Sequence, residues 1–593
     1  MLLKNSFRIH LKKESVEPPV SKTLLFSEGN LAIYSRIPKD SVSFFFRKLE
    51  NYVICLQGNF YLDSALSIDT AKNLDEFSEK LNQIGVEAAI SCIRGGLFSL
   101  AVYDKKSLNL YLKTDNMGIN PLFYRVDDEE IEISDNQFSI SSKENVSYLA
   151  CIEYLKFGYL PFSPSLFENI QRLMPEEFIC IHTQSRQLTK TDKMWYKYVS
   201  VGERHCDIIE STERIHIALE SYFSLMPEKK YMLGLSGGYD SRLILAFLSY
   251  RNPELLHFQN RDNSRDTNLA KKAAELAGLS LNVMGFPQNA LALFHTNLRH
   301  TFRNLNSLEY SHLLFLHYLI NEQKPAYYVD GCAGDTILGG TYYFEGGKDP
   351  ISVLKYIYMQ GNYNHPFQSM RSYEERLYSQ RESVTDFYMQ ELIGKDEKVE
   401  IRKKMRAIVQ FLKAYSQTHE DLLEAIGHYT RTRCLLSTGP TGSLSTVPCL
   451  VPFLDREIKK AALDTSKDLR SMDRLYNHYW NQYHPEFSRI RRSGTGGKAS
   501  SGNVLYRLQH VINYTMKKLQ YLPDNSFLKR REYISVASYL NNMENKSFIE
   551  SSLRNISRKI PERISHFILQ KHEDHVLLSR LLIRFISLNE LLH

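Results

Sequence analysis

The chain has 593 residues, of which 43% are apolar and 24% are charged, and both fractions are typical of globular proteins. A chain of this length folds into about three or four domains, or into two large ones, and its composition excludes a disordered tail, a collagen-like repeat and a disulfide-stabilised miniprotein. The formal net charge is +7, a weak bias that permits an anionic ligand but does not by itself indicate nucleic acid.

The cysteines and the apolar runs favour a cytoplasmic protein. The chain has 8 cysteines and no C-x-x-C pair, so zinc-ribbon, redox-motif and iron–sulfur sites have little support. Residues 1–19 lack the apolar core of about 7–15 residues that a secretory signal needs. No run approaches the ~20 apolar residues that a spanning helix needs. We therefore expect a cytoplasmic location and no membrane partner.

The N-terminal third of the chain is rich in strand patterns. Apolar and polar residues alternate in short runs, and turn residues such as those at 104–107 separate the runs. Short strands of this kind predict a sandwich of antiparallel sheets. The expected strands cover residues 53–62, 97–104, 108–115, 131–140 and 178–182.

The pattern changes near residue 205, where stretches of helical period alternate with short β runs. This alternation predicts a parallel sheet with helices on both faces, and the chain after residue 350 reads as almost entirely helical. Residues 506–593 mix basic and apolar residues and predict an amphipathic extension with a solvated basic face. The expected helices cover residues 207–225, 241–250, 266–278, 310–322, 400–428 and 456–464, and the expected strands 231–235, 255–259, 279–285 and 326–331.

Residues 236–241 carry the most informative motif, Ser-Gly-Gly-Tyr-Asp-Ser, between an apolar strand and a helix. The glycines allow a tight turn and a close approach of the backbone to a ligand. The helix that follows offers unpaired N–H groups and the positive end of its dipole. Asp240 would repel a bare phosphate but not one that carries Mg²⁺. The motif therefore predicts a phosphate-binding loop.

This loop resembles the PP-loop of ATP pyrophosphatases, which cleave ATP between the α- and β-phosphates, and it lacks the Gly-Lys-Ser/Thr of the kinase-type P-loop. Residues 329–340, VDGCAGDTILGG, look like the asparagine synthetase segment whose aspartate holds Mg²⁺ together with the PP-loop aspartate. Residues 451–455, VPFLD, are similar to a segment that lines the same cleft. Asp455 is also expected to act as the N-cap of the helix that follows.

Two further regions extend the resemblance. Asparagine synthetases and their relatives carry a lysine in a mobile loop over the α-phosphate, and residues 491–502, RRSGTGGKASSG, place Lys498 there. A cation at this point would stabilise the charge that develops as pyrophosphate leaves, and the alternative is a solvated lysine in a linker. Residues 95–104 and 115–124 resemble class II glutamine amidotransferase domains. The resemblance to the asparagine synthetase superfamily covers roughly residues 50–500.

The N-terminus departs from the family pattern. A class II glutaminase uses an N-terminal cysteine as its nucleophile, but residue 2 is Leu. Cys55 and Cys92 lie inside strand patterns, so no glutaminase nucleophile is assigned. The resemblance then implies an inactive glutaminase that serves as a scaffold, as in β-lactam synthetases and lasso-peptide cyclases, whose amine belongs to the substrate.

The synthetase half departs as well. Cys332 stands where asparagine synthetases carry Glu, and Thr336 replaces the Glu after the Mg²⁺-binding Asp. Pro448 and Leu450 replace a Glu and an Arg before the VPFLD segment. The loss of these polar groups argues against free aspartate and suits a larger or less polar acyl group. No residue is assigned as the base that deprotonates the amine.

The resemblance implies an α/β protein in which an antiparallel β-sandwich flanked by helices precedes a parallel-sheet PP-loop ATP pyrophosphatase domain. We expect a degenerate class II glutamine amidotransferase-like domain at residues 1–200. An asparagine synthetase-like ATP-binding domain follows at residues 205–505. A helical extension at residues 506–593 packs on the synthetase domain.

The implied activity is that of an AMP-forming amide ligase, which activates a carboxylate as an acyl-adenylate and transfers it to an amine. The alternatives are a lasso-peptide-type macrolactam cyclase, an asparagine synthetase that uses ammonia or glutamine, a PP-loop tRNA-modifying enzyme and an ATP-binding regulator without catalysis. The implied partners are a small-molecule or peptide carboxylate and an amine, without nucleic acid. A homodimer or a biosynthetic-pathway partner is a further candidate.

The implied ligands are ATP and Mg²⁺. Asp240 and Asp335 would hold Mg²⁺, and Lys498 would stabilise the transition state of adenylation. The residues expected to bind ATP and pyrophosphate are Leu235, Ser236, Gly237, Gly238, Tyr239, Asp240, Ser241 and Gly334.

Overall fold

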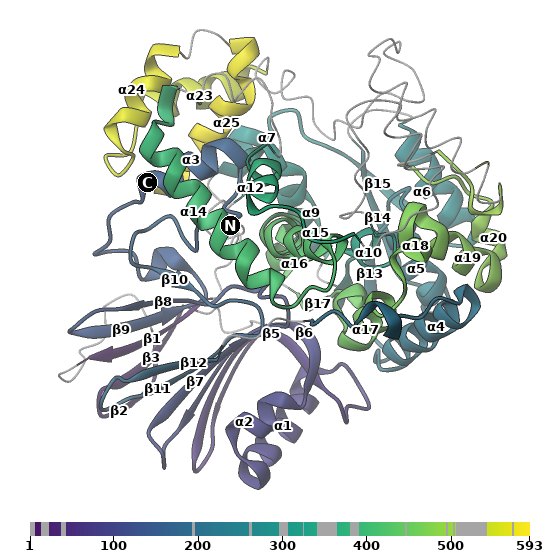
Figure 1. Cartoon of the computed structure of the whole chain (residues 1–593), viewed down its shortest axis with the longest axis horizontal. Helices are drawn as coiled ribbons and strands as arrows, with labels where there is room; N and C mark the ends of the chain where they lie inside the picture. The colour runs from purple at the N-terminus through teal and green to yellow at the C-terminus, as the bar shows by residue number, and fades with distance from the viewer. Residues whose placement is uncertain are drawn as a thin grey trace.

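The structure is a computed structural model of the chain (Figure 1). Antiparallel sheets occupy one side of the molecule, and helices surround a parallel sheet on the other. The structure describes residues 6–12, 23–36, 43–191, 196–259, 264–295, 306–323, 325–340, 365–379, 389, 391–444, 447–493, 496–501, 505, 542–571 and 575–592.

Two six-stranded antiparallel sheets form the N-terminal third. The first has the strand order β10-β8-β9-β1-β3-β2 and the second the order β12-β11-β7-β6-β5-β4. The first sheet contains β1 (Ser6–Lys12), β2 (Thr23–Glu28), β3 (Leu31–Arg36), β8 (Phe123–Val126), β9 (Glu130–Ser134) and β10 (Gln171–Arg172), and the second β4 (Phe44–Lys48), β5 (Tyr52–Leu62), β6 (Ile93–Asp104), β7 (Asn109–Thr114), β11 (Phe178–His182) and β12 (Leu188–Thr191).

The second sheet is buried on both faces. Val53 and Cys55 point into a core shared with the first sheet, and Ile54 and Leu56 point the other way into a separate core, because successive side chains of a strand alternate between faces. Two helices, α1 (Thr70–Ile84) and α2 (Val86–Ser91), close that second core. The predicted antiparallel sandwich flanked by helices is therefore confirmed.

The predicted strand at residues 131–140 is wrong beyond Ser134. β9 ends there, and the side chain of Asn136 accepts a hydrogen bond from the Phe138 N–H, which caps a short 3-10 turn at Gln137–Ser139. Local side-chain capping of this kind competes with continued pairing in a sheet. Cys92, expected inside a strand, ends α2 instead.

The predicted parallel sheet is confirmed and has one more strand than expected. Its order is β15-β14-β13-β16-β17, and all neighbouring pairs are parallel. β13 therefore lies at the centre, with its carboxyl end beside those of its neighbours. The strands are β13 (Tyr231–Gly234), β14 (Glu254–Gln259), β15 (Leu281–Gly285), β16 (Tyr327–Val329) and β17 (Cys449–Leu450), and the early helices are α4 (Ile208–Ser224), α5 (Tyr239–Leu248), α6 (Arg265–Leu276), α7 (Ala290–Phe294) and α9 (Ser311–Gln323).

The single helix expected at residues 400–428 is two helices. α14 ends at Lys413, and Thr418 and Asp421 form a reciprocal capping box that starts α15. A π-helical segment, η6 (His428–Leu436), continues directly from α15. The other helices are α3 (Tyr148–Phe157), α10 (Gly334–Ile337), α12 (Met370–Ser379), α14 (Lys395–Lys413), α15 (His419–Gly427), α16 (Thr438–Ser443), α17 (Arg456–Leu463), α18 (Lys467–Arg470), α19 (Arg474–Tyr483), α20 (Pro485–Ser488), α23 (Met543–Arg554), α24 (Glu562–Lys571) and α25 (His575–Leu592).

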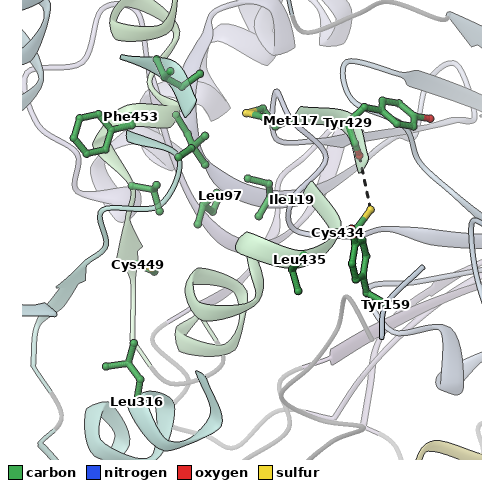
Figure 2. Close-up of a cluster of buried hydrophobic side chains, with 14 of the residues drawn as sticks. Leu97, Met117, Ile119, Tyr159, Leu316, Tyr429, Cys434, Leu435, Cys449 and Phe453 are labelled. Carbon is green, nitrogen blue, oxygen red and sulfur yellow. Dashed lines mark hydrogen bonds between the residues drawn. The ribbon is translucent and has the colours of Figure 1, made fainter. Parts of the chain in front are cut away.

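One hydrophobic core joins the two halves. Figure 2 shows Leu97, Met117 and Ile119 from the N-terminal half close to Leu435 and Phe453 from the other half. All of these side chains are buried. The parallel sheet is therefore held against the antiparallel sandwich by shared apolar packing.

The solvated basic face expected for the C-terminal extension is wrong at Arg584. This residue of α25 is 2% exposed, and its guanidinium pairs with Glu309 at 2.6 Å and donates to the carbonyl oxygens of Leu155 and Lys156 at the end of α3. Figure 1 shows α25 beside α3. In the described part of the chain, no helix combines the length and the apolar character needed to cross a bilayer.

Candidate functional site

The Gly-rich loop connects β13 to α5 and is internally hydrogen-bonded. The Ser236 and Ser241 hydroxyls lie 3.0 Å apart, and the Ser236 and Gly238 N–H groups donate to these two hydroxyl oxygens. The Leu235 N–H donates to the Leu256 carbonyl of β14 at 2.8 Å. The structure therefore brings the predicted loop residues together at the carboxyl edge of the sheet, where open parallel sheets bind ligands.

Gly237 lies in tight contact with two other segments. Its N–H donates to Asp266 at 2.9 Å, so this donor, expected to face a phosphate, is engaged by a carboxylate. A Cβ atom at this position would lie 2.7 Å from Asp266 Oδ1 and 3.1 Å from Ser493 Cβ. The buried Arg242 guanidinium donates to the carbonyl oxygens of Gly237 and Ile490. The loop is thus fixed against α6 and residues 490–493.

The two predicted metal-binding carboxylates, Asp240 and Asp335, lie beside each other. The Asp335 N–H donates to Asp240 Oδ2 at 3.0 Å. Burial raises the pKa of both carboxyls, and the Asp335 charge raises the pKa of Asp240 further. A Cβ atom at Gly334 would lie 2.6 Å from Asp240 Cγ, so only glycine allows this approach. Two repelling carboxylates of this kind fit a divalent cation such as Mg²⁺.

Three groups that the motifs did not indicate surround the carboxylate pair. The Tyr476 hydroxyl of α19 donates to Asp240 Oδ1 at 2.7 Å. The Arg492 guanidinium opposes the burial effect and lowers the pKa of both carboxyls, and it also pairs with Asp473. Arg492 belongs to the segment RRSGTGGKASSG, whose resemblance pointed to Lys498. No sequence signal indicated Tyr476.

Tyr239, predicted to bind ATP, is a buried wall of this site. Its ring lies under two guanidiniums, with Arg492 Cζ at 5.2 Å and Arg242 Cζ at 5.4 Å from the ring centroid. Its hydroxyl donates to the Asn477 side chain at 3.2 Å. The side chain therefore lies against two guanidiniums beside the loop, and its contact with ATP stays a prediction.

Lys498 follows a closed turn. The Arg492 N–H donates to the Gly497 carbonyl and the Gly496 N–H donates to the Arg492 carbonyl, both at 2.8 Å. The Lys498 carbonyl accepts from the Ser501 N–H at 3.1 Å, and the side chain is half-buried. Its proximity to a phosphate stays a prediction, because no bond joins it to the carboxylate pair.

A second group of buried acidic and imidazole side chains lies in the first antiparallel sheet. His10, Glu130 and Glu132 bring their ligand atoms within 4.8 Å of one another. Burial favours the neutral acid, but Lys143, His10 and Arg125 hold the pKa of Glu130 down to about 2. Arg125 also pairs with Glu132 at 2.7 Å. Arg125 and Lys143 already neutralise the carboxylates, whereas burial lowers the pKa of His10, so the group is a structural ion-pair network.

The comparisons with known proteins agree with the N-terminal architecture. Residues 73–196 match the glutamine amidotransferase domain family. A glutamine-hydrolysing asparagine synthetase of Bacillus subtilis is 23% identical over 205 residues, which are 32% of this chain and 31% of that protein. One of Methanocaldococcus jannaschii is 23% identical over 133 residues, which are 21% of this chain and 25% of that protein. The matches thus span about a quarter to a third of the curated relatives' length.

Two solved structures are more distant in sequence. The glutamine phosphoribosylpyrophosphate amidotransferase of B. subtilis is 8% identical and covers 48% of this chain and 85% of its own, with a TM-score of 0.21. An allosteric regulatory enzyme of purine biosynthesis is 11% identical and covers 71% of this chain and 88% of its own, also with a TM-score of 0.21. These scores carry no argument about the fold. Over the segments that they cover, the matched domain and the two curated relatives support an asparagine synthetase-like superfamily assignment.

Proposed function

We propose that the chain is an ATP-dependent, AMP-forming ligase that joins a carboxylate to an amine. The observation that carries the proposal is the half-buried Asp240–Asp335 pair, which lies next to the Gly-rich loop at the carboxyl edge of the parallel sheet. Because burial raises the pKa of each carboxyl, a bound cation would stabilise the charged pair. Asp240 and Asp335 would hold Mg²⁺, which would neutralise the phosphate charge of ATP.

The proposed reaction has two steps. A substrate carboxylate oxygen attacks the α-phosphorus of ATP, and pyrophosphate leaves with the electron pair of the broken P–O bond. An amine then attacks the acyl carbon, and AMP leaves. The Ser236 and Ser241 hydroxyls would donate to pyrophosphate, and Lys498 and Arg492 would stabilise the developing charge. Closure of residues 496–501 over the site would exclude water from the acyl-adenylate.

We propose further that the amidotransferase-like half is a scaffold without glutaminase activity. The Cys55 thiol is buried, and burial raises its pKa. Burial raises the pKa of the Cys151 thiol to about 12, and thiols of this kind are poor nucleophiles. Incubation with glutamine should release no glutamate, and glutamate release would contradict the scaffold role.

The test of the ligase is the exchange of radiolabelled pyrophosphate into ATP, screened with the twenty amino acids and short acidic peptides as carboxylate probes. We expect exchange with at least one probe and AMP as the nucleotide product. Asp240→Asn should reduce exchange at least about 100-fold, because one of the two cation ligands is lost. Asp396→Asn, at an exposed position of α14, is the matched control. Production of ADP would contradict the mechanism.

A further inference from the structure

Asp330 lies at the carboxyl edge of the parallel sheet, as the carboxylate pair does. It directly follows β16, the strand between β13 and β17. Val329 is paired with Leu233 on one side and with Leu450 on the other, and the Asp330 N–H donates to the Leu450 carbonyl at 2.9 Å. Neighbouring strands are about 4.8 Å apart, so Asp330 lies one strand away from the Gly-rich loop.

Two hydrogen bonds hold the Asp330 carboxylate in place. Oδ1 accepts the Cys332 N–H at 2.7 Å, and the Tyr328 hydroxyl also bonds to the carboxylate. Oδ2 faces α16 at Gly439, where a Cβ atom would lie 3.6 Å from it and 3.6 Å from Leu313 Cδ2. Glycine leaves this space open. The side chain is half-buried, so the carboxylate is partly accessible at this edge of the sheet.

The surroundings of Asp330 suit a proton acceptor. Burial raises the pKa of Asp330 to about 6, and the bonds from Cys332 and Tyr328 limit the rise. The titratable groups that face it are the Tyr328 hydroxyl and the Cys332 and Cys449 thiols. Burial raises the pKa of all three well above the ordinary range, so they stay neutral. At neutral pH Asp330 is therefore a carboxylate among neutral neighbours, and the thiol at Cys332 is too weakly acidic to replace it.

We infer that Asp330 is the general base of the ligation step. As the lone pair of the neutral amine forms the C–N bond, the nitrogen loses a proton to Asp330 Oδ2, and the C–O bond to AMP breaks with its electrons on the phosphate oxygen. This inference rests on the proposed ligase function and deepens it. It gives Asp330 a role in the second half-reaction only, whereas Asp240 and Asp335 serve the first.

The test separates the two half-reactions in Asp330→Asn, whose amide oxygen can still accept the Cys332 N–H. Pyrophosphate exchange, supported by the carboxylate probe that the wild-type enzyme uses, should stay within about threefold, which also shows that the variant is folded. Amide formation from ammonia should fall by about 10²–10⁴-fold, the usual range for loss of a general base. Hydroxylamine is mostly neutral at pH 7 and depends less on a general base. The fall in hydroxamate formation should therefore be at least tenfold smaller than the fall in amide formation.

Two further measurements test whether Asp330 accepts the proton of the amine. The ammonia-dependent rate of the wild-type enzyme should rise with pH through about 6, and this limb should be absent in Asp330→Asn. Tyr328→Phe removes a donor that favours the carboxylate and should move the limb to higher pH. Normal exchange with undiminished amide formation in Asp330→Asn would overturn the role of Asp330. Absence of exchange in the wild-type enzyme with every probe would instead remove the proposed function, and this inference with it.

Discussion

The Tyr61 hydroxyl donates a hydrogen bond of 2.7 Å to Asp455, although 394 residues separate them in the sequence. The same carboxylate accepts from Arg94 at 3.0 Å and caps α17 as predicted, by accepting from the N–H groups of Glu457 and Ile458. One buried side chain thus satisfies donors from both halves of the molecule. Asp455 therefore caps α17 locally and also joins the two halves of the molecule.

We expect Tyr61→Phe to lower the free energy of unfolding by about 1–3 kcal/mol, because it removes a buried donor and leaves Asp455 less satisfied. Denaturant titration monitored by fluorescence measures the change. Tyr52→Phe is the matched control, since the Tyr52 hydroxyl donates to Leu81 within the sandwich at 3.0 Å. If the free energy of unfolding falls no more in Tyr61→Phe than in the control, the contact contributes little to holding the two halves of the molecule together.

Gly334→Ala should abolish pyrophosphate exchange without unfolding the protein. The new methyl group would overlap the Asp240 carboxyl and force the two aspartates apart, so the cation site would lose its geometry. Gly202→Ala is the control, because a Cβ atom at that position meets nothing within 4 Å. Pyrophosphate exchange at the wild-type rate in Gly334→Ala would show that the reaction does not need the close approach of the two loops.

Tyr476→Phe should raise the Mg²⁺ concentration needed for half-maximal exchange by about 10-fold, as is common when a hydrogen bond to a metal ligand is lost. The hydroxyl fixes Asp240 Oδ1 and favours its charged form. Tyr479→Phe, on the same helix, removes a hydroxyl that bonds to His216 at 2.9 Å instead. Equal Mg²⁺ requirements in the two variants would contradict this positioning role.

Glu424 should give the fold part of its acid sensitivity. Burial favours the neutral acid, but Arg470 and Lys467 hold the pKa of Glu424 at about 2, below its ordinary 4.5. The folded-state pKa is depressed, so its stabilising contribution is complete above pH 4.5 and is lost as the pH falls towards 2. Glu424→Gln should cost about 3–5 kcal/mol of unfolding free energy at pH 7.

Denaturant titrations at several pH values check this dependence. The stability difference between the wild-type protein and Glu424→Gln should shrink as the pH falls from 4.5 to 2, whereas Glu550→Gln, at an exposed position, should differ little at any pH. A difference that stays constant with pH would show that Glu424 is not the group that titrates.

The sequence predicted the elements whose signals are local. Alternating strands such as β5 and the strand–loop–helix around Gly237 follow from periodicity and glycine placement, and Asp455 was predicted to cap α17 from its position alone. The domain boundaries and the roles of Lys498, Leu235 and the serines stay predictions. β1 to β4 were not predicted, since their runs are short and lie between polar segments.

The missed site residues share a different cause. Tyr476 and Arg492 act through contacts made only when distant segments meet, and no spacing within one segment encodes such contacts. The Asp330 carboxylate bonds to its near neighbours Cys332 and Tyr328, but the Asp330 N–H bonds to the distant Leu450. The buried position of Arg584 could not be predicted for the same reason. A basic residue at helical spacing indicates a solvated face until its partner, Glu309, is known.

The pairing of Arg584 with Glu309 also bears on how the chain folds while it is being synthesised. The two residues are 275 positions apart, and chains are synthesised at about 5–20 residues per second. Glu309 therefore waits on the order of 10–60 seconds on the ribosome before its guanidinium partner is made, and the end of α3, 428 residues before Arg584, waits about 20–90 seconds. During that interval Glu309 of the nascent chain has no counter-charge, although its carboxylate becomes buried in the folded protein. A chaperone that shields the surface around Glu309 would act at this stage.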